Sequence, residues 1–270
     1  MNGTNLASIA TLAVLIALSG SSRAETAREL LDQAKAVNEA REPKDLRQRM
    51  KMLLVDSRGT PRTREIEVFS KNGAEDETKS ITFFLSPADV KGVGFLAWAH
   101  HDREDDQWLY LPALKRVRRI TSTARRQSFQ GSDFSYADLE LFDEIPDWTD
   151  EDAAATLVSP HQDVDGTDTA TIELVPRGKD VEYARIVVWL ARGDSTLRRI
   201  ELYDADRSLV KRLKLADFRT VAGIPTPHRL EMVNEKKGTR TILELSGVTY
   251  NQGLGDDVFT ERSLVRGRVD

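Results

Sequence analysis

Four histidines and several acidic clusters are the side chains in this sequence most suited to acid–base or metal chemistry. His100 and His101 fall in an expected strand, where neighbouring side chains point to opposite faces, so the pair does not readily bind one metal ion. Asp163, Asp165 and Asp168 have the spacing of part of a calcium loop, but the glycine and the terminal glutamate of an EF-hand are misplaced. The residues around Asp165 are therefore interpreted as a hairpin turn.

Catalytic and nucleotide-binding motifs are missing from the sequence. It has no G-x-S-x-G, P-loop or G-x-G-x-x-G pattern. It has no cysteine, which excludes disulfides, thiolate metal sites, a cysteine nucleophile and a lipid-modified cysteine. A carboxylate pair brought together by folding, or a hydrolase that uses His101 or His228, stays open as an alternative. We predict a protein without catalytic activity, cofactor or metal.

A basic cluster stands out because the whole chain has a formal net charge of −5. That net charge opposes nucleic-acid binding. Anionic lipid head groups or an acidic patch on a membrane partner fit the cluster better, since arginine pairs well with phosphate and carboxylate. A solvated strand edge that discourages edge-to-edge pairing is the alternative. The cluster consists of Lys115, Arg116, Arg118, Arg119, Arg125 and Arg126.

The N-terminal residues indicate export. An uncharged apolar run extends from Leu6 to Leu18, and the small residues Ser22 and Ala24 suit the −3 and −1 positions of signal-peptidase cleavage. An uncleaved anchor is the alternative, but the run is shorter than the ~20 residues that span a bilayer. We predict a signal peptide over residues 1–24, one domain over 25–270, and a periplasmic location.

The elements that position these groups follow from hydrophobic periodicity. Helical spacing predicts a helix over 27–37, and residues 136–142 predict a second one capped by Asp133 or Ser135. Residues 256–264 predict a third helix. From Leu46 the period changes to two, with turn residues in the gaps. Strands are expected at 47–55, 62–70, 78–85, 94–100, 107–111 and 117–121, and then at 155–159, 169–176, 183–191, 197–203, 210–220, 226–234 and 240–250.

Some ten or eleven strands joined in sequence, with few helices, predict a mainly β (α+β) fold. A sheet of that size has to curl, close or pack on something to cover its apolar face. We therefore predict one large curved antiparallel sheet that forms a half-open barrel, with helices covering its concave face. Such an apolar concave face favours a ligand cavity over an active site.

One long segment carries a family resemblance. Its two parts are D-D-Q-W-L-Y-L-P-A-L-K-R-V-R-R-I from Asp105 and G-S-D-F-S-Y-A-D-L from Gly131. They resemble the outer-membrane lipoprotein-sorting protein family, periplasmic relatives of LolA and LolB, and the match is clear over residues 92–140. The resemblance implies a half-open barrel that holds acyl chains of a lipid or lipoprotein. It also implies an inner-membrane exporter of the resistance-nodulation-division (RND) superfamily as a partner. The chain departs from LolA itself in length and in this signature.

The predicted function is a periplasmic carrier that shuttles a lipid or lipidated ligand between membranes, as a monomer with peripheral membrane contact. The alternative is a non-carrying accessory subunit that docks an exporter. An inward Arg116 or Arg118 is expected to pair with Asp133 or Asp138 and latch the middle of the chain. Predicted ligand-lining residues, each of which could instead be core, are Phe84, Phe95, Trp98, Trp108, Tyr110, Phe134, Tyr136 and Trp189. Predicted partner or gate residues are Arg116, Arg118, Arg119, Asp133 and Asp138.

Overall fold

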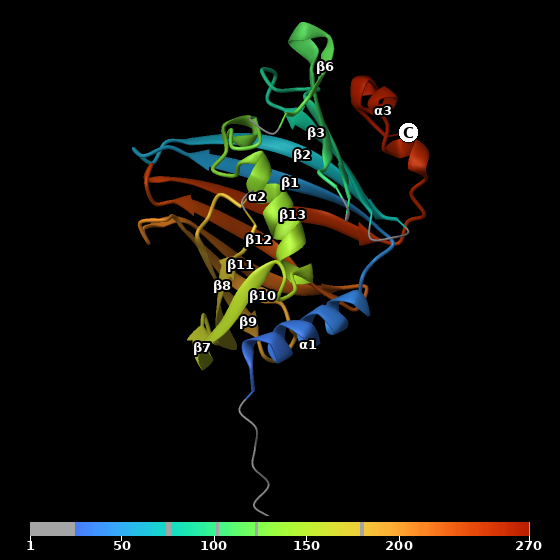
Figure 1. The fold of residues 1–270 in the computed structure, drawn as a ribbon. Helices are drawn as coiled ribbons and strands as arrows, with labels where there is room; N and C mark the ends of the chain where they lie inside the picture. Colours follow the sequence, from blue (N-terminus) through green and yellow to red (C-terminus); the bar gives the residue numbers. More distant parts are fainter. Residues whose placement is uncertain (1–24, 74–76, 101–102, 122–123, 179–180, 270) are drawn as a thin grey trace, which may run out of the picture.

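One antiparallel sheet of 13 strands dominates the computed structural model, and the sheet curves without closing (Figure 1). The structure describes residues 25–73, 77–100, 103–121, 124–178 and 181–269, so the predicted signal peptide and His101 lie outside it. The prediction of a large curved antiparallel sheet is confirmed. The sheet has 13 strands, more than the total of ten or eleven, because every range expected above, including the short β6, pairs as a full member of it.

Two hairpin series make up the sheet, and its spatial order is β6-β5-β4-β3-β2-β1-β13-β12-β11-β10-β9-β8-β7. The first series is β1 (Asp45–Val55), β2 (Pro61–Asn72), β3 (Thr78–Ser86), β4 (Gly94–Ala99), β5 (Asp106–Leu111) and β6 (Arg116–Arg119). The second is β7 (Ala153–Val164), β8 (Thr167–Pro176), β9 (Arg185–Ala191), β10 (Leu197–Tyr203), β11 (Leu209–Val221), β12 (Ile224–Asn234) and β13 (Thr239–Tyr250). The first and last strands of the chain, β1 and β13, pair in the middle of the sheet and join the two series.

The two edges of the sheet are therefore β6 and β7, which follow one another in the sequence. The chain has to travel from one edge to the other between them. The described residues between β6 and β7, 120–121 and 124–152, are here called the crossover segment and carry helix α2 (Tyr136–Glu144) over the concave face (Figure 1). The strand order thus explains why the middle of the chain covers the cavity.

Helix α1 (Ala27–Glu39) lies at the lower end of the sheet and packs near β7 (Figure 1). It begins at a capping box, in which the Thr26 hydroxyl accepts from the backbone N–H of Glu29 and the Glu29 carboxylate accepts from that of Thr26. Leu30 and Ala34 form its buried side. The predicted helix over 27–37 is confirmed and extends two residues further.

Helix α3 (Glu261–Arg266) lies on the convex face, opposite α2 (Figure 1). Its Leu264, together with Phe259, packs against Phe69, Phe83 and Leu96. The expectation that helices cover the concave face is right for α2 and wrong for α3. The convex face of β2 to β5 carries its own large aromatic side chains, and these need covering from outside.

Candidate ligand cavity

Asp133 fixes the crossover segment to the middle of the sheet. Its backbone N–H donates to the Thr241 hydroxyl at 2.9 Å, and its carboxylate accepts from the hydroxyls of Thr241, at 2.8 Å, and Thr239. Gly131 has a φ of +75°, a conformation that suits glycine and turns the chain just before this anchor. The G-S-D-F-S-Y stretch therefore serves to fasten the segment across the concave face.

Asp138 fixes the next turn of the same segment. It lies in the first turn of α2 and completes a capping box with Ser135, which confirms Ser135 as the N-cap. Its fully buried carboxylate also accepts from Lys211 Nζ at 2.5 Å and from the Tyr183 hydroxyl at 2.6 Å. Burial, and then the Asp138 carboxylate, raise the pKa of Tyr183, so this phenol stays protonated and donates. Helix α2 is thereby tied to β11.

A cavity of about 420 Å³ lies between the crossover segment and the concave face. Most of its wall is aliphatic and comes from both halves of the sheet, while β3 and β4 contribute small side chains such as Ser80 and Ala97. The large aliphatic residues that the sheet contributes to the wall are Leu46, Met50, Met52, Ile66, Val68, Leu197, Ile200, Leu213, Leu215, Leu230, Leu243 and Leu245, and α2 adds Leu139. The volume lies in the range of small-molecule sites.

Four of the predicted lining residues lie on the concave side. Phe95 and Phe134 line the cavity. Tyr136 and Phe84 are buried beside it, where the Tyr136 ring centroid lies 5.5 Å from that of Phe95 and the Phe84 centroid 6.0 Å from that of Phe129. These rings form an aromatic wall under the crossover segment.

The other four predicted lining residues lie on the convex face. Trp98, Trp108 and Tyr110 pack in the cluster that α3 covers, and the Trp98 indole donates to the Phe259 carbonyl at 3.1 Å. Trp189 packs with Val164 on the same outer side. The strand period explains the correction, because Gln107 pairs with Ala97 on the cavity side, which turns Trp108 outward. Ligand contact by any of the eight residues stays a prediction.

The predicted ion pair of Arg116 or Arg118 with Asp133 or Asp138 is wrong, because neither aspartate is bound by an arginine of β6. Arg116, Arg118 and Arg119 are exposed on the edge strand β6. Arg119 forms an ion pair with Asp106, and the described residues offer no ion pair to Arg116 or Arg118. The cation that holds Asp138 is Lys211, which is remote in sequence and therefore escaped an argument based on nearby charges.

Of the histidines in the hydrolase alternative, His228 is described and His101 is not; His228 and the neighbouring His100 both have local partners. His100 is buried between Glu77 and Asp106, at 3.3 and 3.2 Å from their carboxylate oxygens. His228 is buried, and its Nδ1 lies 3.0 Å from the Thr226 carbonyl, so this nitrogen carries the proton. No group of three or more potential metal ligands occurs among the described residues.

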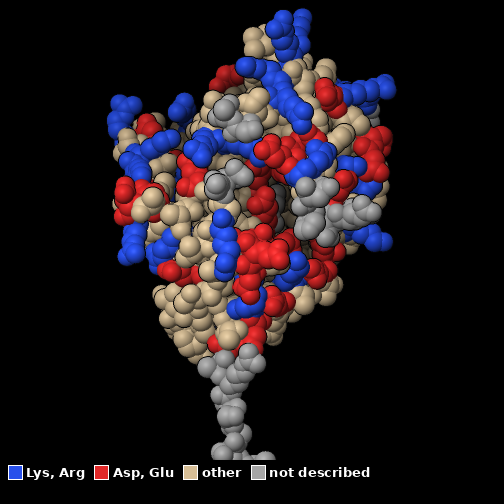
Figure 2. Space-filling view, viewed as in Figure 1, with Lys and Arg blue, Asp and Glu red and all other residues tan. Residues whose placement is uncertain are grey.

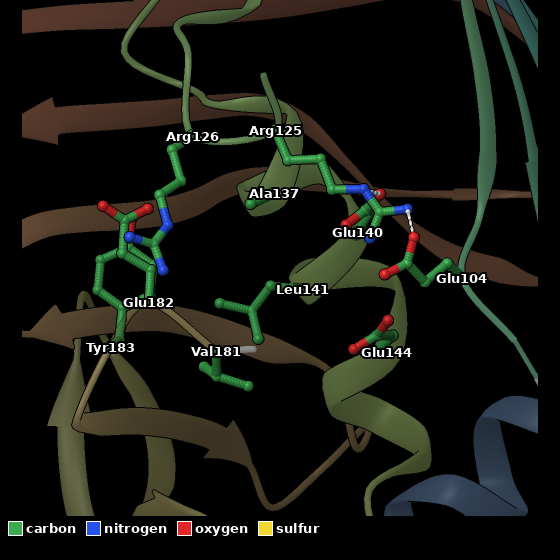
Figure 3. Close-up of a pocket in the computed structure, with 10 residues that line it drawn as sticks. All are labelled: Glu104, Arg125, Arg126, Ala137, Glu140, Leu141, Glu144, Val181, Glu182 and Tyr183. Carbon is green, nitrogen blue, oxygen red and sulfur yellow. Dashed lines mark ion pairs between the residues drawn. The ribbon is translucent and has the colours of Figure 1, made fainter. Parts of the chain in front are cut away.

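The mouth of the cavity is acidic, a feature that sequence reasoning missed. Asp and Glu side chains gather beside a hollow in the centre of the face that α2 occupies (Figure 2). A second cleft, of about 520 Å³, opens there between α2, the loop before it and residues 181–183. It is lined by Glu104, Arg125, Arg126, Ala137, Glu140, Leu141, Glu144, Val181, Glu182 and Tyr183 (Figure 3).

Glu140 lines both the outer cleft and the inner cavity. Arg125 reaches across the cleft to it, with Nε 3.3 Å from Oε1, and also pairs with Glu104 (Figure 3). Burial raises the pKa of Glu140 to about 7, because the nearby Arg125 only partly offsets the loss of water. Burial likewise raises the pKa of Asp105 and of Glu144. The mouth therefore holds more carboxylates than its arginines balance.

Comparisons with known proteins agree with this architecture. A family profile described as "Uncharacterized protein" matches residues 76–266. A crystal structure of an outer membrane lipoprotein-sorting protein domain from Vibrio parahaemolyticus is 31% identical, with a TM-score of 0.79, over 89% of this chain and 98% of that one. A DUF1329 family protein from Desulfovibrio piger is 28% identical, with a TM-score of 0.80, over 88% of this chain and 98% of that one.

A LolA superfamily protein from Nitrosomonas europaea shares the fold, at 19% identity and a TM-score of 0.64, over 89% of this chain and all of that one. No curated protein matches this chain. Within the described part of the chain, no helix is both long and apolar enough to cross a membrane.

Proposed function

Because this chain belongs to the outer-membrane lipoprotein-sorting protein family, we propose that it is a periplasmic carrier for the acyl chains of a lipid or lipidated ligand. The observation that carries this proposal is the aliphatic cavity of about 420 Å³ beneath the crossover segment. The carrier acts without catalysis, by burying hydrocarbon that water would otherwise surround.

The cavity wall suits a flexible chain. Burial of hydrocarbon contributes about 0.8 kcal/mol per CH₂, so ten buried methylenes supply on the order of 8 kcal/mol before the costs of association. Methionine side chains such as Met50 and Met52 adapt to irregular shapes, and both lie in the wall. Affinity then follows chain length more than the identity of any one contact.

Loading requires the crossover segment to move, since it covers the concave face. The segment is held at a few polar points, chiefly Asp133 with Thr241 and Asp138 with Lys211. A partner that binds the open state better than the closed one would shift the equilibrium towards release. We propose an RND-superfamily exporter in the inner membrane as that partner, approached through the exposed arginines of β6.

A non-carrying accessory subunit is the second candidate, favoured by the same edge strand. Arg116 and Arg118 are exposed there, and Leu114, which precedes the strand in the sequence, is also exposed. Such a subunit has no need of an empty interior, and large aromatic side chains would be expected to fill the concave face. The aliphatic cavity of the present chain supports the carrier.

The test is native mass spectrometry of the protein purified gently from the periplasm, with solvent extraction of anything bound. A carrier is expected to show discrete adducts of lipid mass. If only the mass of the ligand-free protein is found, also after incubation with vesicles of bacterial phospholipids, the carrier proposal is overturned in favour of the docking subunit.

A further inference from the structure

The cavity wall is mostly apolar, with small neutral polar side chains such as Ser80 and Thr82, and the charged residues among its described lining gather in one place. Asp105, Gln107 and Glu140 line it together, at the point where the inner cavity meets the acidic cleft. Gln107 faces this end because it pairs with Ala97, another cavity residue, across β4 and β5. A ligand that fills the cavity lengthwise therefore brings one of its ends to these three side chains.

Gln107 is an incomplete hydrogen-bonding group. Gln107 is only 2% exposed, and its side-chain Nε2 donates a hydrogen bond to Glu140 Oε1 at 2.7 Å. Its Oε1 is buried and has no hydrogen-bond partner among the described residues. The opposite amide orientation would turn this oxygen towards the Glu140 carboxylate, so the free position is an acceptor. What is missing at this end of the cavity is a hydrogen-bond donor.

The surrounding charges make a cationic donor favourable. The described carboxylates around the two cavities are Glu104, Asp105, Glu140, Glu144 and Glu182, and the described cations are Arg125 and Arg126. Arg125 is shared, since it contacts Glu104 and Glu140 and also donates to the Asp105 carbonyl at 3.1 Å. Glu104, Glu144 and Glu182 are exposed, so the burial cost falls on Asp105 and Glu140, which are half-buried. A positive group placed beside these two carboxylates relieves that cost.

On the basis of the carrier function proposed above, we propose that the cavity selects amphiphiles whose polar end is a protonated amine. The ammonium group lies between Gln107 Oε1 and the carboxylates of Glu140 and Asp105, and the hydrocarbon chain extends along the aliphatic wall. The amine supplies the donor that Gln107 lacks, and it adds positive charge where the carboxylates outnumber the two arginines. A carboxylate head group would meet repulsion at the same place.

Three probes with the same fourteen-carbon chain test this selectivity: tetradecylamine, tetradecanol and tetradecanoate. Each amphiphile is used below the concentration at which it aggregates, and its affinity is measured at pH 8 by displacement of a fluorescent apolar dye from the purified protein. The amine is expected to bind at least about tenfold more tightly than the alcohol, and the carboxylate more weakly than both. Equal affinities would overturn the amine selectivity and leave the carrier intact, whereas binding of none of the three would overturn the carrier itself.

Glu140→Gln tests the site directly. The amine's advantage over the alcohol is expected to fall by about tenfold, while the affinity for tetradecanol stays the same, because the aliphatic wall is untouched. The matched control is Glu231→Gln on the convex side of β12, where the carboxylate pairs with Arg229. The proposed site would be contradicted if the amine's advantage fell equally in both variants, or if it fell in neither.

The pH gives an independent readout in the wild-type protein. Glu140 gains a proton below about pH 7, because burial raises its pKa, Arg125 partly offsets that rise, and the charges of Asp105, Glu144 and Glu104 add to it. The advantage of the amine is therefore expected to shrink between pH 8 and pH 5.5, while tetradecanol binding stays level. A constant amine advantage over this range would exclude Glu140 as the amine's partner.

Discussion

Lys211 Nζ lies 2.5 Å from Asp138 Oδ2, and this ion pair joins the crossover helix to strand β11 across the concave face. The two residues are 73 positions apart in the sequence. The Asp138 side chain is fully buried, and that of Lys211 is 11% exposed. The pair therefore holds the cover of the cavity with charges that water barely screens.

Lys211→Met should destabilise the protein by about 3–5 kcal/mol, because it leaves the buried Asp138 carboxylate without its cation. Urea unfolding at pH 7.5 measures the change. Lys214→Met is the control on the same strand, since Lys214 pairs with Asp165 near the surface, where such a pair contributes ~0–1 kcal/mol. Similar losses in the two variants would show that the ion pair with Asp138 does not fasten the helix.

Glu140→Gln should stabilise the protein at pH 8, by about 1–3 kcal/mol. Burial raises the pKa of Glu140 to about 7, above the value of about 4.3 for an unfolded glutamate. The folded state thus binds this proton more tightly, and the ionised group lowers stability as the pH rises from about 4 through 7. The gain should vanish near pH 4, where glutamate is protonated in both states. Thermal unfolding at both pH values measures it, and a gain that persists at pH 4 would contradict the raised pKa.

Asp45→Asn should cost about 2 kcal/mol at pH 7, since the buried Asp45 carboxylate accepts three backbone N–H groups from residues 252–254 at 2.6, 2.7 and 3.0 Å. Burial acts to raise the pKa of Asp45, but these donors, with Lys71 nearby, hold it below its ordinary value. The stabilisation is present above the unfolded pKa of about 3.9 and is lost as the pH falls through the lower folded value. The difference between variant and wild type should therefore narrow in acid. Urea midpoints at pH 7 and pH 3 measure it, and a constant difference would mean that the carboxylate charge contributes nothing.

The elements were predictable because their signals are local. The change from helical spacing around Leu30 to period two after Leu46 located the first helix and the first strand. The capping role of Ser135 also followed from its neighbours in sequence. Pairing of β1 with β13 was not predictable in this way, because it joins residues far apart in the sequence, such as Leu46 with Tyr250. This pairing makes β6 and β7 the edges and draws the crossover segment over the cavity.

The cavity residues were harder to predict because β4 and β5 carry large apolar side chains on both faces. Trp108 and Tyr110 are the larger side chains of β5, which favoured them as the cavity wall, but they lie under α3. Phe95 and Trp98 stand three positions apart on β4, so a regular strand places them on opposite faces. Only one of these two residues can therefore line the cavity. The acidic mouth depends on α2 meeting β5, which no local pattern shows.

Substitutions at Ala97 should close the cavity in steps. Ala97 lines the cavity from β4, opposite Gln107, so a larger side chain there occupies the space of the ligand. Ala97→Leu should lower the affinity for a fourteen-carbon amphiphile by several-fold, and Ala97→Trp by roughly tenfold or more, since each displaced methylene contributes about 0.8 kcal/mol. Probe displacement measures the affinity, and circular dichroism confirms that each variant folds. Val158→Trp adds the same indole at an exposed position of β7 and should leave binding unchanged. Full affinity in a folded Ala97→Trp variant would place the ligand outside this cavity.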